Sequence, residues 1–142
     1  MTGVQTCALP IFSSLAFALS PASAFAWGPI GHRVVGRIAE RHLTEAAARG
    51  VAAILGSESL VQAATWPDEI RSDPAWKRAE PWHFVSIDDS ETYETAPKSA
   101  GGDVVEAIGR FTGVLQDPTA EAGKKAEALR FLVHFEIGRA HV

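Results

Sequence analysis

The sequence predicts an all-α protein, and three observations carry that prediction. Apolar residues recur at three- and four-residue spacing through most of residues 30–135, which is the period of helices that bury one face. Only Trp82–Ile87 alternates in the manner of a strand, and this segment is short enough to be simply extended. Apolar types make up 46% of the 142 residues and charged types 21%, a composition typical of a folded domain.

The first two helices are predicted over Ile30–Leu43 and Glu45–Leu55. Thr44 is a suitable N-cap for the second helix and Gly56 a suitable C-terminal stop. In the first helix, Arg33, Arg37, Glu40 and Arg41 are expected to face away from the core. The residues expected to face the core are Val34, Val35, Ile38, Ala39 and His42.

The middle of the chain has weaker signals. Ser57 is expected to cap a short helix over Glu58–Ala64. Trp66–Pro81 is interrupted by Pro and Asp residues, which predicts a loop with one or two short turns. Asp88–Gly102 is polar and predicts a surface loop.

Two more helices are predicted toward the C-terminus. Asp103 begins a strongly amphipathic segment that runs to Leu115, and Pro118 breaks it. The last helix is expected to begin at Thr119 or Ala120 and to be still helical at Glu136. One of its faces is apolar and comprises Ala126, Leu129, Leu132 and Val133.

Charge and cysteine content exclude several classes of protein. The formal net charge is -4, whereas a protein that grips duplex DNA by its phosphates needs a basic surface. Cys7 is the single cysteine, so an internal disulfide framework and a Cys-rich zinc site are excluded. No apolar run reaches the roughly 18 residues of a membrane span.

The two ends carry a pattern that is not typical of protein sequence. Gln5–Ile11 and Glu136–Val142 can be encoded by opposite strands of one oligonucleotide, GATCGGAAGAGCACACGTC, which resembles a sequencing-library adapter. Coincidence under codon degeneracy is the alternative. We therefore expect residues 1–11 and 136–142 to be translated adapter DNA and exclude them from reasoning about the fold.

Between the first artefact and the charged part of the chain lies a candidate export signal. Phe12–Ala26 is apolar, rich in small residues and free of charge, and it ends in the cleavage pattern Ala24-Phe25-Ala26. A buried helix is the alternative, which Pro21 opposes. Cleavage after Ala26 would make Trp27 the new N-terminus of an exported protein, periplasmic or secreted.

Three residues have the chemistry of zinc ligands. His83 lies in the aromatic segment Pro-Trp-His-Phe, His134 lies on an apolar helix, and Asp68 follows Trp-Pro. A buried histidine needs a hydrogen-bond partner or a metal. A lone histidine is more often structural, but an Asp and two His in one small helical domain are typical of a hydrolytic zinc site.

His32 has a different setting, because it lies five residues after the predicted new N-terminus at Trp27. A free α-amino group has a pKa near ~8, so it can lose its proton and bind a metal at neutral pH. The amine and the carbonyl of one residue can chelate an ion, which a nearby histidine can complete.

Five blocks in order, WGPIGHRVVGRIAERHL, ATWPDEIR, PWHFV, GDVVEAI and ALRFLVHF, resemble the zinc-dependent single-strand nucleases of the S1/P1 type, which are kin to zinc phospholipase C. The match covers Trp27–Phe135. The resemblance implies an exported, all-α, multi-helix domain that holds three zinc ions in a cleft, is monomeric when complete and has no association with membranes after signal cleavage.

The resemblance also implies roles for individual residues. Trp27 would bind one zinc through its amino nitrogen and carbonyl oxygen, with His32 beside it. Asp68, His83 and His134 would bind a second zinc. Arg71 lies three residues after Asp68, where the family carries a basic residue near the scissile phosphate; a solvated surface arginine is the alternative.

The chain departs from the family pattern after Phe135. Family members continue with Gly-Asp and then His-Gln-Pro-Leu-His, and the Asp belongs four residues after the histidine. This chain has Gly138 at that position, so the bridging carboxylate is absent, as are the ligands of the third zinc. Residues 27–135 therefore resemble the N-terminal half of a truncated family domain, and little or no nuclease activity is expected from it alone.

The activity implied for the parent protein is metal-assisted hydrolysis of single-stranded DNA or RNA to 5′-phosphorylated products. The zinc ions would carry the charge that attracts phosphate, which removes the objection from net charge -4. Two alternatives stay open: a phospholipase C-like phosphodiesterase on the same scaffold, and a non-catalytic exported helical binding domain.

Overall fold

The computed structural model describes residues 28–139, and this part of the chain contains helices and no strand. The all-α prediction is confirmed. The predicted artefact at 1–11, the predicted signal at 12–26 and Trp27 lie outside the described residues. The elements in order are α1 (Pro29–His42), α2 (Glu45–Leu55), α3 (Leu60–Ala63), α4 (Trp66–Glu69), the 3₁₀ helices η1 (Ile70–Ser72) and η2 (Pro74–His83), α5 (Val104–Gln116) and α6 (Ala122–Arg139).

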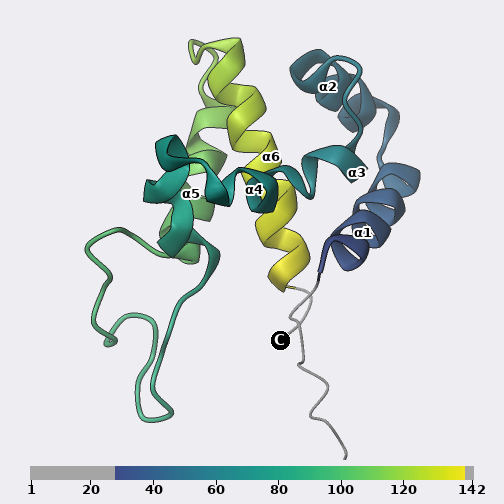
Figure 1. Ribbon diagram of the computed structural model, residues 1–142. Coiled ribbons are helices and arrows are strands. Elements are labelled where there is room, and N and C mark those ends of the chain that lie inside the picture. The colour runs from purple at the N-terminus through teal and green to yellow at the C-terminus, as the bar shows by residue number, and fades with distance from the viewer. Residues whose placement is uncertain (1–27, 140–142) are drawn as a thin grey trace, which may run out of the picture.

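Helix α6 is the central element of the fold. In Figure 1 it runs between α5 on one side and α1 and α2 on the other, and it contacts all five other α-helices. None of the helices described between residues 28 and 139 is long and apolar enough to cross a lipid bilayer.

Helix α2 is bounded as predicted. The Thr44 side chain accepts a hydrogen bond from the Ala47 backbone N–H at 3.2 Å. At the other end Gly56 has φ 64° and donates its N–H to the Ala52 carbonyl at 2.9 Å. A positive φ is accessible to glycine at little cost, so Gly56 ends the helix.

The buried face of α1 is only partly the predicted one. Val35 and Ala39 are half-buried as expected, but Val34 and Ile38 are 51% and 52% exposed and His42 is exposed, whereas His32 and Gly36 are buried. Gly36 permits this orientation because α3 passes close to it: a Cβ on Gly36 would lie 3.0 Å from the Leu60 carbonyl oxygen. Close backbone approach, and not side-chain hydropathy, therefore sets the rotation of α1.

The third helix begins later than predicted, at Leu60, and its cap is Ser59 instead of Ser57. The Ser59 hydroxyl accepts from the Gln62 backbone N–H at 3.2 Å, and the Gln62 side chain accepts from the Ser59 N–H at 3.0 Å. This reciprocal capping box satisfies two backbone donors at once. Ser57 could not form such a box, because the residue three positions later is Leu60.

The prediction of a loop with one or two short turns over Trp66–Pro81 underestimated its helical content, because this segment forms α4, η1 and most of η2. Pro67 and Pro74 lie in the first turns of α4 and η2, where the missing N–H of proline costs nothing. The Asp73 carboxylate caps η2 by accepting from the Ala75 N–H at 2.9 Å. Prolines and aspartates therefore start short helices here.

After η2 the chain leaves the helical body. Of the predicted short strand or extended segment, Trp82 and His83 belong to η2, and residues 84–87 have no regular structure and no partner strand in the described part of the chain. The predicted surface loop follows, and α5 begins after Asp103 as predicted. The Asp103 carboxylate accepts from the N–H groups of Val105 and Glu106 and from the hydroxyl of Tyr93.

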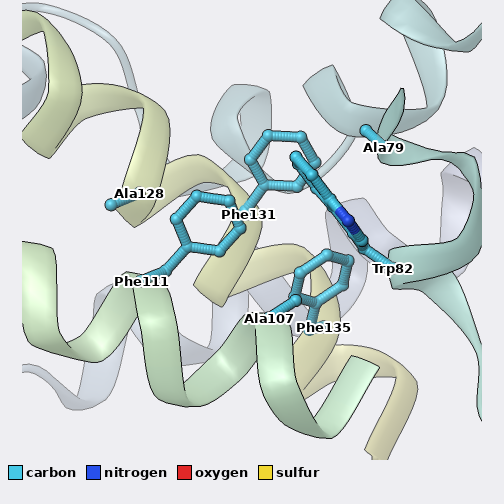
Figure 2. Close-up of a cluster of buried hydrophobic side chains, with 7 residues drawn as sticks. All are labelled: Ala79, Trp82, Ala107, Phe111, Ala128, Phe131 and Phe135. Atoms are coloured by element: carbon cyan, nitrogen blue, oxygen red, sulfur yellow. The ribbon is translucent and has the colours of Figure 1, made fainter. Parts of the chain in front are cut away.

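Helix α6 begins at Ala122, later than predicted, because Thr119 is engaged in a turn capped by Asp117. Two apolar clusters meet on α6. The first, shown in Figure 2, comprises Ala79, Trp82, Ala107, Phe111, Ala128, Phe131 and Phe135. The second comprises Leu55, Leu60 and Ala63, with Ala126, Leu129 and Val133 of α6 packed against it.

Candidate metal centre

Three of the predicted ligands lie together where α1, α4 and α6 meet. His32 is in the first turn of α1, Asp68 is in α4, and His134 is in α6. One ligand atom of each residue lies within 4.8 Å of the other two. Both histidines are buried at 6% exposure, and the Asp68 side chain is 31% exposed. We call these three residues the His–Asp–His group.

The orientation of His134 leaves one ring nitrogen available to a metal. Its Nδ1 lies 2.9 Å from the Ala64 carbonyl oxygen, and a carbonyl only accepts, so Nδ1 carries the proton. Its Nε2 lies 3.9 Å from Oδ1 of Asp68. Two electron-rich atoms thus face each other, which is a suitable place for a cation.

His32 lies parallel to His134. The two ring centroids are 4.3 Å apart and the ring planes differ by 10°. The Nδ1 of His32 lies 3.4 Å from the carbonyl oxygen of Gly28, four residues earlier. This weaker contact again directs the proton to Nδ1 and leaves Nε2 free.

His83 borders the group without belonging to it. Its ring lies edge-on to His134 with centroids 5.2 Å apart. Its Nδ1 donates to the Ala79 carbonyl at 3.0 Å, and its Nε2 is buried without a hydrogen-bond partner among the described residues. A buried imidazole nitrogen with no partner is costly unless a ligand satisfies it.

Burial favours the neutral form of His83 and His134. Desolvation lowers the pKa of His134 to about 4, although the hydrogen bond to Ala64 opposes the shift. Desolvation also lowers the pKa of His83 below its ordinary value, against the hydrogen bond to Ala79. Neutral histidine is the form that binds metal ions, so both rings are ready ligands at neutral pH.

The donor set and its support fit zinc. Zinc binds imidazole nitrogen and carboxylate oxygen, and ligating histidines usually donate their other N–H to a backbone carbonyl or a carboxylate. His32, His83 and His134 all show this arrangement with carbonyl groups. The orphaned Nε2 of His83 is a further indication of a missing partner.

The grouping differs in one respect from the one that the resemblance implied. That resemblance placed His32 with Trp27 and His83 with Asp68 and His134. The structure places His32 directly against His134 and Asp68, whereas His83 contacts His134 through its ring. Trp27 lies outside the described residues. Arg71 is half-exposed, and its Nη1 lies 3.6 Å from Oδ1 of Asp68.

The sequence analysis did not indicate the three carbonyl groups that orient the histidines, those of Gly28, Ala64 and Ala79. Ala79 lies four residues before His83, so helical spacing within Pro74–His83 could have indicated it. Ala64 lies 70 residues before His134, and no sequence signal connects them.

Comparison with known proteins identifies relatives of this chain. The model of the S1/P1 nuclease family matches residues 27–141. Nuclease P1 of Penicillium citrinum is 36% identical over 118 residues, which cover 77% of this chain and 43% of that protein. Nuclease S1 of Aspergillus oryzae is 30% identical over 130 residues, 82% of this chain and 43% of that protein.

A plant relative shows the same coverage. Endonuclease 4 of Arabidopsis thaliana is 31% identical over 133 residues, which cover 83% of this chain and 44% of that protein. The chain thus spans less than half the length of these curated relatives. Because the family match includes the whole described part of the chain, the chain belongs to the S1/P1 nuclease family.

Proposed function

We propose that this chain is the N-terminal part of an exported zinc-dependent endonuclease, which hydrolyses single-stranded DNA and RNA to 5′-phosphorylated products. The observation that carries the proposal is the His–Asp–His group, whose donor atoms lie within 4.8 Å of one another on three separate helices. The names of the relatives, nucleases and an endonuclease, support the reaction class.

The proposed zinc ligands are those named from the sequence. Trp27 and His32 would hold one ion, and Asp68, His83 and His134 a second, with a third ion held by residues of the remainder of the domain. When bound, zinc supplies positive charge toward phosphate and lowers the pKa of water to about 7, so that a hydrolytic nucleophile exists at neutral pH.

Protein groups around the ions would orient the substrate. Arg71, half-exposed beside Asp68, offers a guanidinium that can donate two hydrogen bonds to a phosphate. Because the net charge is -4, binding of a single strand would depend on the ions, on this local cation and on base stacking, with little long-range attraction.

The 142-residue chain alone is expected to lack nuclease activity. The resemblance requires a carboxylate four residues after His134, and Gly138 occupies that position. The complete protein is expected to be monomeric, and removal of Phe12–Ala26 on export would expose the Trp27 amine. N-terminal sequencing of the exported protein tests this point, and any start other than Trp27 contradicts it.

The test of the function uses the complete gene product. It should cleave single-stranded DNA and RNA, leave phosphatidylcholine intact and lose activity on removal of zinc. His134→Ala should abolish cleavage, whereas His42→Ala, at an exposed histidine of α1, should not. Hydrolysis of phosphatidylcholine instead would favour a phospholipase C-like enzyme, and retention of less than one zinc per chain would contradict both enzymes.

A further inference from the structure

One turn before His134, α6 carries an arginine that reaches a distant part of the chain. Arg130 Nε lies 3.1 and 3.0 Å from the two carboxylate oxygens of Glu58, and its Nη2 lies 2.5 Å from Oε2. The two side chains are 26% and 20% exposed. A bidentate pair of this kind fixes direction as well as distance.

This ion pair and the His134 hydrogen bond form two attachments between the same elements. Arg130 and His134 are four residues apart and so lie on one face of α6. Their partners bracket α3: Glu58 precedes the helix and Ala64 follows it. Two attachments fix the rotation of α6 about its own axis, which a single attachment leaves free.

The same guanidinium also contacts the helix that carries Asp68. Arg130 Cζ lies 5.0 Å from the centre of the Trp66 ring, and Trp66 begins α4 two residues before Asp68. Arginine readily stacks on an aromatic face while it donates hydrogen bonds in its own plane. Arg130 therefore connects the elements that supply two members of the His–Asp–His group.

Apolar packing holds α6 in place but does not provide this precision. Phe131 is fully buried in the first cluster and Leu129 packs against the second. Burial of apolar surface is nearly non-directional, so it tolerates small rotations that would carry Nε2 of His134 away from Asp68. Loss of the ion pair should therefore leave the fold and disturb the site.

We propose that Arg130 is a positioning residue for the metal group, acting with Glu58 to fix His134 and Asp68 relative to each other. The inference rests on the proposed zinc-binding function. It adds that the ion pair between Arg130 and Glu58, which joins residues 72 positions apart in the sequence, determines how tightly the group binds its metal.

The test measures zinc affinity of the full 142-residue chain by competition with a chelator, and hydrogen exchange of the His134 Nδ1 proton by NMR without metal. Arg130→Met retains the apolar stem and removes the charge. It should weaken zinc binding about tenfold, the lower limit usual for groups that support metal ligands, and should accelerate exchange of the proton. Arg130→Lys should recover only part of the affinity, because lysine lacks the planar fork.

Two controls separate positioning from general stability. Arg49→Met removes an exposed arginine of α2 that pairs with Glu45 at 3.6 Å, and it should change neither measurement. Ile108→Ala thins the packing of α5 against the first cluster. It should lower the melting temperature without weakening zinc binding as Arg130→Met does.

Each outcome decides the proposal. Unchanged affinity and unchanged exchange in Arg130→Met would overturn it, as would an equal loss of affinity in Ile108→Ala. If Arg130→Met does not fold, Glu58→Gln, which retains an oxygen acceptor, is measured in the same way and decides by the same criteria. Failure of the unmodified chain to bind zinc would instead refute the proposed function, while proton exchange still reports on the attachment.

Discussion

Gly36→Ala tests the close approach of α1 and α3, which sets the position of His32. A Cβ at this residue would lie 3.0 Å from the carbonyl oxygen of Leu60 and 3.1 Å from the Cα of Val61. Both atoms belong to the backbone, so neither can move away alone as a flexible side chain could. The helices must separate by a few tenths of an ångström, and overpacking of this kind costs about 1–3 kcal/mol.

Gly50→Ala is the matched control, because a Cβ there would meet nothing within 4 Å. Alanine is favoured over glycine in a helix by about 1 kcal/mol, and this gain applies to both positions. The difference between the two variants therefore isolates the steric cost.

Urea unfolding followed by circular dichroism measures both variants. We expect Gly50→Ala to be more stable than the unmodified chain, and Gly36→Ala to be about 1–3 kcal/mol less stable than Gly50→Ala. Zinc affinity should also fall in Gly36→Ala, since His32 lies one turn away on α1. Equal stabilisation by the two substitutions would refute the reasoning about α1 and α3.

Three further predictions concern the core, a cap and the metal-free site. Phe131→Ala removes a fully buried ring and should lower the free energy of unfolding, measured with heat or urea, by about 3–5 kcal/mol. Asp103→Ala removes a cap that accepts two backbone N–H groups and should cost about 1–2 kcal/mol. The pKa of His134 is lowered from 6.5 to about 4 in the folded state, so the unfolded chain binds the proton first. Stability of the metal-free chain should therefore fall as pH decreases from 6.5 to 4. His134→Asn should flatten that slope, and the exposed His42→Asn should not.

Signals that lie next to each other in the sequence predicted local structure well. Helix α2 has its bounds because Thr44 and Gly56 act on backbone groups within four residues of themselves. The capping box of α3 is equally local: two serines precede the helix, and Ser59, with Gln62 three residues later, caps it instead of the predicted Ser57. Such errors come from competing local signals and not from tertiary structure.

The face of α1 could not be predicted in this way. Hydropathy favours Val34 and Ile38 as core residues, and both are about half exposed. The buried face contains His32 and Gly36, a polar residue and one without a side chain, because a Cβ at position 36 would lie only 3.0 Å from the backbone of α3. That contact joins residues more than 20 positions apart and leaves no local trace.

The candidate site also combines features that the sequence indicates with contacts that only the folded structure shows. Residue type and ordered blocks indicated His32, Asp68, His83 and His134. The supporting contacts, His134 to Ala64 and Arg130 to Glu58, span 70 and 72 residues. Candidate ligands can therefore be named from the sequence, whereas the contacts that orient them depend on the packing of α6 against α3.

The His–Asp–His group lies between the two apolar clusters, and this position leads to a final prediction: bound zinc should stabilise the fold. On α6, Val133 packs against the second cluster and Phe135 belongs to the first, so His134 lies at the boundary between them. Ala39 and Leu43 place α1 on the second cluster, and Trp66 places α4 on the first. An ion held by Asp68 and His134 would thus join α4 to α6 at this boundary, beside His32 of α1.

Because the ligands come together only in the folded chain, bound zinc should add its binding free energy to folding. At a free zinc concentration about 100 times the dissociation constant, the gain is about 2.7 kcal/mol. Thermal unfolding of the 142-residue chain with zinc and with excess chelator measures it. His134→Ala should abolish the zinc-dependent shift and His42→Ala should retain it. A shift of equal size in both variants would show that zinc stabilises the chain at some other place and not by joining α4 to α6.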